Sequence, residues 1–172
     1  TFVDSSATGL NNGTSWNDAY TNLNTAIDSS SAGESIWVAT GTYTPNRHPR
    51  QITGSPTLTN KDFTFHLVNG VKLYGGFDGT ETARSERDYV SNVTILSGDL
   101  GTVGSASDNC YHVIMTANLN ATAVIDGFTI QDGNANGGNT TNQYGGRNFA
   151  RELGGGIANN VSSPTLSNLI VI

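Results

Sequence analysis

The sequence predicts an all-β fold in which short parallel strands stack in successive coils, a β-solenoid. The main observation is an internal repeat, because the segment 123–130 (Ala-Val-Ile-Asp-Gly-Phe-Thr-Ile) returns in altered form at 164–171. Three apolar positions recur 41 positions later: Ile125, Phe128 and Ile130 as Leu166, Leu169 and Val171. Each copy holds two short strands with a small or amide residue between them, Gly127 or Asn168. We expect these 41 positions to span two coils of about 20 residues each, since repeat architectures stack equivalent positions.

Composition supports the same fold class. The chain has 172 residues, of which 21 are glycine, and it is 35% hydrophobic but only 13% charged. Such a chain can bury one sizeable core, but it is poor in the charged residues that favour helical bundles. Asn, Thr and Ser provide most of the polarity, and these residues suit turns because their side chains bond nearby backbone groups.

Charge and cysteine content exclude several classes of function. The net charge of −6 argues against a nucleic-acid partner, which would require a concentrated basic surface. No stretch of 18 apolar residues occurs, so the sequence predicts no membrane span. The single cysteine, Cys110, cannot form an internal disulfide, and its place before an apolar strand indicates packing rather than reactivity.

The first expected element is an amphipathic helix over residues 16–27, with Thr14 or Ser15 as its N-terminal cap. Its apolar residues recur at helical spacing: Trp16, Ala19, Tyr20, Leu23, Ala26 and Ile27. A solenoid exposes an open edge at its first coil, so we expect residues 1–33 to form a cap over that edge. Trp16 and Tyr20 are then core residues, with stacking on sugars as the alternative.

Strands are expected along the rest of the chain, 34–172, which we interpret as coils of one domain. They cover residues 36–38, 63–67, 71–77, 93–96, 111–115, 124–130 and 165–172. Steps of about 20 residues without helical periodicity between them favour stacked coils over a doubly wound sheet. Two stretches rich in Gly, Asn, Thr and Pro, 45–62 and 133–153, are expected to be loop insertions and the first places to look for binding.

The order of motifs resembles secreted bacterial right-handed parallel β-helix proteins of the pectin-lyase-like superfamily, related to the repeats of chlamydial polymorphic outer-membrane proteins. Four blocks carry the resemblance: Gly-Thr-Ser-Trp-Asn-Asp-Ala-Tyr at 13–20, Ile-Trp-Val-Ala-Thr-Gly-Thr-Tyr at 36–43, Val-Lys-Leu-Tyr-Gly-Gly-Phe at 71–77, and Val-Ile-Asp-Gly-Phe-Thr-Ile at 124–130 followed by Gly-Gly-Gly-Ile at 154–157. The resemblance implies a right-handed parallel β-helix with an N-terminal capping α-helix. It also implies a secreted or cell-surface location and further coils or domains after Ile172, the chain being the N-terminal part of a longer protein.

Lyases of this superfamily use calcium held by acidic residues and an arginine base. Asp78 and Asp99 are the first metal candidates, because their separation of 21 positions would stack them on neighbouring coils. Asp132 opens a segment, Asp-Gly-Asn-Ala-Asn-Gly, that resembles the start of a calcium loop. The alternative in each case is a turn in which the side chain bonds backbone amides, and it is favoured. The sequence therefore predicts no cofactor, with calcium as the alternative.

Two groups of residues are candidates for glycan contact. Arg47, His48 and Arg50 form the only basic cluster, in the first insertion, and could pair with carboxylate or sulfate groups; a solvated loop is the alternative. The second insertion interleaves aromatic and basic side chains, which stack on sugar rings and bind acidic groups: Tyr144, Arg147, Phe149 and Arg151. Packing of the two aromatic residues against a coil is the alternative.

Catalysis is not supported by the motifs. The lyase signatures that the resemblance would require, Trp-Ile-Asp-His and a spaced Arg-Pro-Arg, are absent, and Arg87 is better explained by a local ion pair than as a base. His66 and His112 lie in strand-like segments without metal-ligand spacing. The sequence therefore predicts a non-catalytic extracellular module for adhesion or contact with polysaccharide or cell-surface glycan. A polysaccharide lyase or glycosidase and a structural spacer are the alternatives.

Overall fold

The computed structural model describes residues 1–49 and 57–172, and its regular structure is almost entirely β. The one α-helix in these residues is α1 (Leu23–Ser29). The strands are β1 (Phe2–Val3), β2 (Ser35–Ala39), β3 (Gly41–Tyr43), β4 (Phe65–His66), β5 (Lys72–Phe77), β6 (Thr94–Ser97), β7 (Ile114–Ala117), β8 (Val124–Gln131), β9 (Thr141–Tyr144), β10 (Arg147–Ala150), β11 (Ile157–Asn160) and β12 (Thr165–Val171). The predicted all-β class is confirmed.

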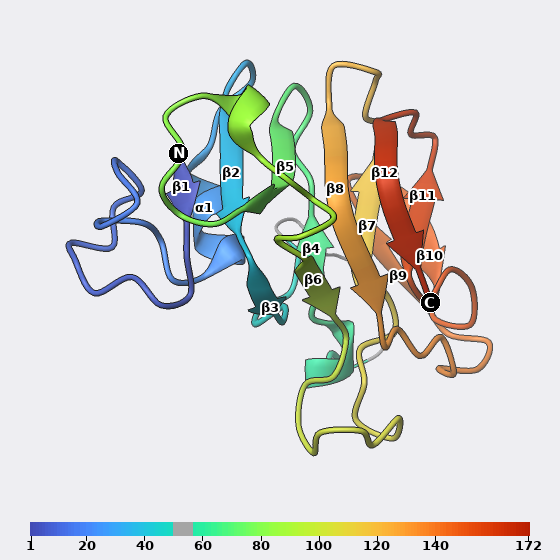
Figure 1. Ribbon diagram of the computed structural model, residues 1–172. Coiled ribbons are helices and arrows are strands. Elements are labelled where there is room, and N and C mark those ends of the chain that lie inside the picture. The colour runs from blue at the N-terminus through green and yellow to red at the C-terminus, as the bar shows by residue number, and fades with distance from the viewer. Residues whose placement is uncertain (50–56) are drawn as a thin grey trace.

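The strands form three parallel rows. In the first row β1, β2, β5, β8 and β12 lie side by side, as Figure 1 shows from blue to red. In the second row, β3 pairs with β6, and β6 pairs with the C-terminal half of β8. The C-terminal half of β12 pairs with that same half of β8, so both long strands take part in two rows. The third row is a separate sheet of β4, β7 and β11. The chain thus returns to each row in the same direction.

The predicted 41-position repeat is confirmed as a direct strand pair. Strand β12 pairs with β8 in parallel, with Leu166 opposite Ile125 and Val171 opposite Ile130. The predicted coil length of about 20 residues is wrong, because the chain passes through all three rows before it returns. The steps of about 20 residues seen in the sequence lead from one row to the next, so 41 positions make one circuit rather than two.

The core lies between the three rows. Each row contributes fully buried apolar side chains at equivalent positions, so that successive circuits place like residues side by side: Ile36, Leu73 and Ile125 from the first row, Leu96 and Ile130 from the second, and Phe65 and Ile114 from the third. Cys110 is buried in the same cluster, and burial raises the pKa of its thiol to about 12. The predicted packing role of this cysteine agrees with its position.

The predicted N-terminal helix is shorter than expected. Helix α1 starts at Leu23 and is capped by Asn22, whose side chain accepts a hydrogen bond from the Thr25 amide. Residues 16–22 lie outside the helix; Tyr20 forms a bridge with Val3, and Trp16 packs between the rings of Phe2 and Phe77. Apolar spacing alone suggested a helix here, but bonding to β1 fixes an extended backbone.

Of the two predicted insertions, 45–62 and 133–153, the structure describes the second completely and the first without residues 50–56. The second contains an antiparallel hairpin, β9 and β10, which the polar sequence of residues 141–144 did not indicate. No helix among the described residues has the length and apolar character needed to cross a membrane.

Candidate functional site

A row of bends joins the first strand row to the second. Gly76 (φ 93°), Gly127 (φ 85°) and Asn168 (φ 49°) all adopt left-handed backbone conformations, which glycine and asparagine tolerate best. Space also requires glycine, because a Cβ atom added at Gly76 would lie 2.6 Å from the Cα atom of Tyr89. The bends therefore allow a second segment of chain to cross the sheet in close contact.

That segment, residues 84–93, is held over the bends by Arg87. The Arg87 guanidinium donates to the Gly75 carbonyl (3.1 Å), to the Asp126 carbonyl (3.2 Å) and to Asp126 Oδ2 (2.6 Å). Asp126 Oδ1 in turn accepts a hydrogen bond of 2.7 Å from Asn168 Nδ2. Arg87 thus connects β5 with β8, and Asp126 connects β8 with β12, at the place where the backbones bend.

The guanidinium groups of this segment lie over aromatic rings of β5 and of the segment itself. Arg84 lies 4.6 Å from the ring centre of Tyr74, and Arg87 lies 5.2 Å from Tyr74 and 5.4 Å from Tyr89. Cations over aromatic faces are attracted by the ring quadrupole. Tyr89 is therefore held in place although 41% of it is exposed.

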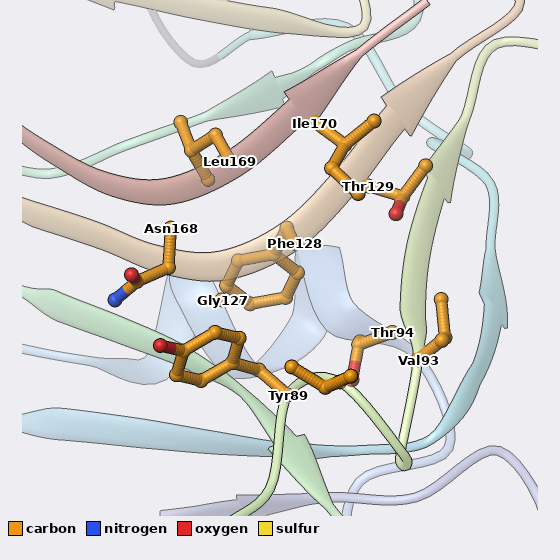
Figure 2. A pocket seen from close by; sticks show the side chains of 10 residues that line it. Tyr89, Val93, Thr94, Gly127, Phe128, Thr129, Asn168, Leu169 and Ile170 are labelled. Carbon is orange, nitrogen blue, oxygen red and sulfur yellow. The ribbon is translucent and has the colours of Figure 1, made fainter.

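A groove of about 290 Å³ opens between this segment and the bends of β8 and β12. Figure 2 shows the Tyr89 ring and Asn168 on one side, Val93 and Thr94 on the other, and Phe128 between them. Leu169 and Ile170 of β12 complete the wall, together with Val90, Gly127 and Thr129. The groove thus combines a mainly apolar surface and a fixed aromatic ring with the polar groups of Asn168 and Thr129.

The basic cluster predicted in the first insertion is bound to the protein itself. Arg47 forms an ion pair of 2.7 Å with Asp28 of α1 and donates to Thr25 (2.9 Å). His48 Nε2 lies 3.0 Å from the Thr59 carbonyl, and its ring packs on Phe63. Arg50 lies outside the described residues. Arg47 and His48 thus fasten the insertion to its surroundings.

The aromatic residues predicted in the second insertion contact each other and the third row. Phe149 is buried against Met115, Ala117 and Ala158, and Tyr144 packs on it with ring centres 6.2 Å apart. Burial, with a smaller effect of Asp28, raises the pKa of Tyr144 to about 12. Tyr144 and Phe149 therefore pack against the third row, which was the alternative to glycan contact.

The two arginines of the second insertion differ sharply. Arg147 is only partly buried and donates to Asn118 Oδ1 at 2.7 Å. Arg151 is buried and binds both carboxylate oxygens of Asp62, each at 2.7 Å. Arg147 and Tyr144 lie near a second hollow of about 310 Å³, which Tyr144 lines with His66 and Leu119. Arg151 instead joins the two insertions.

The three predicted acidic metal candidates do not meet. Asp78 accepts from Thr80 in its own turn, and these hydrogen bonds lower the pKa of its carboxyl. Asp132 accepts from Ser97 and Gln131, each at 2.8 Å, and Asp99 accepts from the Gly104 amide at 2.7 Å. In residues 1–49 and 57–172 no group of three or more His, Cys, Asp or Glu side chains is arranged to hold a metal ion.

The predicted stacking of Asp78 and Asp99 is wrong because it relied on the wrong coil length. Asp78 follows β5 in the first row, whereas Asp99 follows β6 in the second. The calcium-loop interpretation of residues 132–137 also loses a ligand, since Asn136 Oδ1 accepts a hydrogen bond of 2.9 Å from Lys61.

Sequence reasoning missed Tyr89, Asp126 and Asp62 as important side chains. The pair Gly75 and Gly76, together with Gly127 at the matching place in β8, was the available signal for the groove, because glycines in strands mark close approach of another backbone. No comparable signal marks Asp62, whose partner Arg151 lies 89 positions away.

Comparison with known proteins adds no relative: no family model, no curated protein and no solved structure matches this chain.

Proposed function

We propose that this chain is a right-handed parallel β-helix module that contacts polysaccharide at the groove beside Tyr89, outside the cell and without cleaving the polymer. Three features support the assignment as a right-handed parallel β-helix. They are the three rows of parallel strands, the return of the chain to each row, and the line of bends between the first row and the second. The resemblance of the four sequence blocks supports the same assignment.

The observation that carries the proposed function is the groove itself. A half-exposed tyrosine held by a cation beside an apolar surface suits the flat, apolar face of a sugar ring, while Asn168 and Thr129 offer hydrogen-bonding groups for hydroxyls. Contacts of this kind are weak singly, and a polymer engages several of them at once.

The charges near the groove support contact rather than proton transfer. Arg87 already donates to three acceptors, and both carboxylate oxygens of Asp126 accept hydrogen bonds. A base has to reach its substrate proton within hydrogen-bond distance, and these side chains are instead engaged by the protein.

The test is affinity electrophoresis of the 172-residue chain in gels that contain soluble acidic or neutral polysaccharides. We expect retardation by at least one polymer and about a fivefold weaker affinity for Tyr89→Ala, because an aromatic contact contributes about 1 kcal/mol. Val103→Ala, an exposed residue outside the groove, is the matched control.

Three results would count against the proposal. Unchanged retardation of Tyr89→Ala would remove the groove as the site, and loss of retardation in a Tyr144→Ala, Arg147→Ala variant would move it to the second insertion. Absence of binding to any polymer would leave a structural spacer. Ultraviolet-absorbing unsaturated products from pectate or alginate, with or without calcium, would show a lyase.

A further inference from the structure

The loop between β6 and β7 is closed on itself by hydrogen bonds at its base. The Cys110 amide donates to the Gly98 carbonyl at 2.8 Å, which brings the two ends of residues 98–110 together. Within the loop, Asp99 Oδ2 accepts from the Gly104 amide and Asp108 Oδ2 accepts from the Thr102 amide, each at 2.7 Å. This loop projects away from the strand rows, below β6 in Figure 1.

Three side-chain oxygens in this loop are buried without a hydrogen-bond donor among the described residues. They are the Oδ1 atoms of Asp99, Asp108 and Asn109. Asn109 as a whole is only 7% exposed. Buried acceptors are rarely left without a partner, because each one loses its hydration, and the loss is greatest for carboxylates.

The three residues lie at or next to the two ends of the loop, where its base is closed. Asp99 directly follows Gly98, and Asn109 directly precedes Cys110, the two residues joined by the backbone hydrogen bond. Asp108 reaches across to the first half of the loop, because its carboxylate accepts a hydrogen bond from the Thr102 amide and lies close to Gly101. Two carboxylates and one amide oxygen therefore share one small, closed segment.

The chemistry of these atoms indicates their ligand. All three are hard oxygen acceptors, and two of them carry negative charge. Lys61 Nζ reaches this loop, where it donates to the Ser107 carbonyl (3.2 Å), and it also donates to Asn136 Oδ1 (2.9 Å), but it does not bond any of the three oxygens. Calcium takes six to eight oxygen ligands in flexible geometry, including carboxylates, amide oxygens, backbone carbonyls and water. Magnesium requires a stricter octahedron, and zinc prefers nitrogen and sulfur.

We propose that Asp99, Asp108 and Asn109 bind a calcium ion that fastens the loop between β6 and β7. The site is separate from the groove beside Tyr89, and it uses neither Asp78 nor Asp132. Two ligands come from one end of the loop and one from the other, so the ion holds the ends together and stabilises the passage from the second row to the third.

The test is thermal unfolding of the 172-residue chain in excess EGTA and in calcium chloride. We expect calcium to raise the unfolding temperature by about 5–10 °C at about 100 times the dissociation constant, with a smaller rise for magnesium. Asp99→Asn and Asp108→Asn should each weaken calcium binding at least tenfold in titration calorimetry. Asp78→Asn, which alters a carboxylate bonded within its own turn, should bind calcium like the wild type.

Asn109→Asp provides a variant that does not depend on loss of folding, since an added negative ligand should tighten calcium binding. The proposal is overturned if calcium leaves the unfolding temperature of the wild type unchanged, or if Asp99→Asn and Asp78→Asn respond to it equally. An equal rise with magnesium would overturn the choice of calcium. Polysaccharide is absent from every arm, so these results do not depend on the groove.

Discussion

At the scale of single residues, the ion pair of Asp62 and Arg151 is almost completely buried. Their side chains are 1% and 7% exposed, and they join the first insertion to the second. Asp62 also accepts from the Thr59 amide and from Asn142, so that both of its oxygens are saturated. Charges are tolerated in such places only when they are paired and hydrogen-bonded.

Removing the positive partner should therefore destabilise the protein strongly. We expect Arg151→Met to lower the free energy of unfolding by about 3–5 kcal/mol, because Asp62 would stay buried without its counter-ion. Arg147→Met is the matched control; its side chain makes one hydrogen bond near the surface, and its change should stay within about 0.5 kcal/mol. Urea unfolding measures both values, and equal losses would contradict the assigned difference between the two arginines.

At the scale of elements, α1 takes the place of a strand beside β4. Its polar side chains bond groups on and near that strand: Asn24 donates to the Thr64 carbonyl, and Asp28 contacts His66 at 3.1 Å. Its apolar side chains Leu23, Ala26 and Ile27 enter the core. The helix thus provides a hydrogen-bond donor for the backbone next to β4 and adds three apolar side chains to the core.

Asn24 fastens α1 to the backbone on either side of the first insertion. It is fully buried, donates to the Thr64 carbonyl at 2.9 Å and accepts from the Asn46 amide at 3.2 Å. We expect Asn24→Ala to lower the free energy of unfolding by about 2–3 kcal/mol, since the buried Thr64 carbonyl and the Asn46 amide both lose their partner. Asn22→Ala, which removes only the helix N-cap bond, should lower it by about 1 kcal/mol. Similar values for both variants in urea unfolding would show that Asn24 does not hold the edge of β4.

Strand positions were predictable where apolar residues alternate. The expected strands at 36–38, 71–77 and 124–130 coincide with β2, β5 and β8. The hairpin of β9 and β10 could not be predicted in this way. Its strands are mainly polar and are paired through backbone hydrogen bonds, so the sequence shows no alternation of apolar residues. The predicted helix was too long because an apolar pattern was present without a helix. Trp16 and Tyr20 have helical spacing, but they contact Phe77 and β1.

At the scale of the whole molecule, the repeat predicted which residues lie side by side but not how long one circuit is. Leu166 and Ile125 pair as expected, yet one circuit visits three rows. A repeat seen in only two copies fixes an offset, and it cannot show how many rows the intervening chain crosses. The groove depends on the same missing information, because Tyr89 meets Gly127 and Asn168 only when the circuits are correctly aligned.

The last circuit leaves an apolar strand at the edge of the described structure. Val171 is 53% exposed although its register partner Ile130 is completely buried, and Leu166 and Ile170 are also exposed. Edge strands of this kind pair with other chains unless a charge blocks them.

We expect the 172-residue chain to self-associate at high concentration through β12, and Val171→Lys to weaken this association at least tenfold in light scattering coupled to gel filtration. Val103→Lys, on a loop residue that is 92% exposed, should associate like the wild type. A wild-type chain that stays monomeric at about 100 μM, or equal effects of both lysines, would show that β12 is not the associating edge.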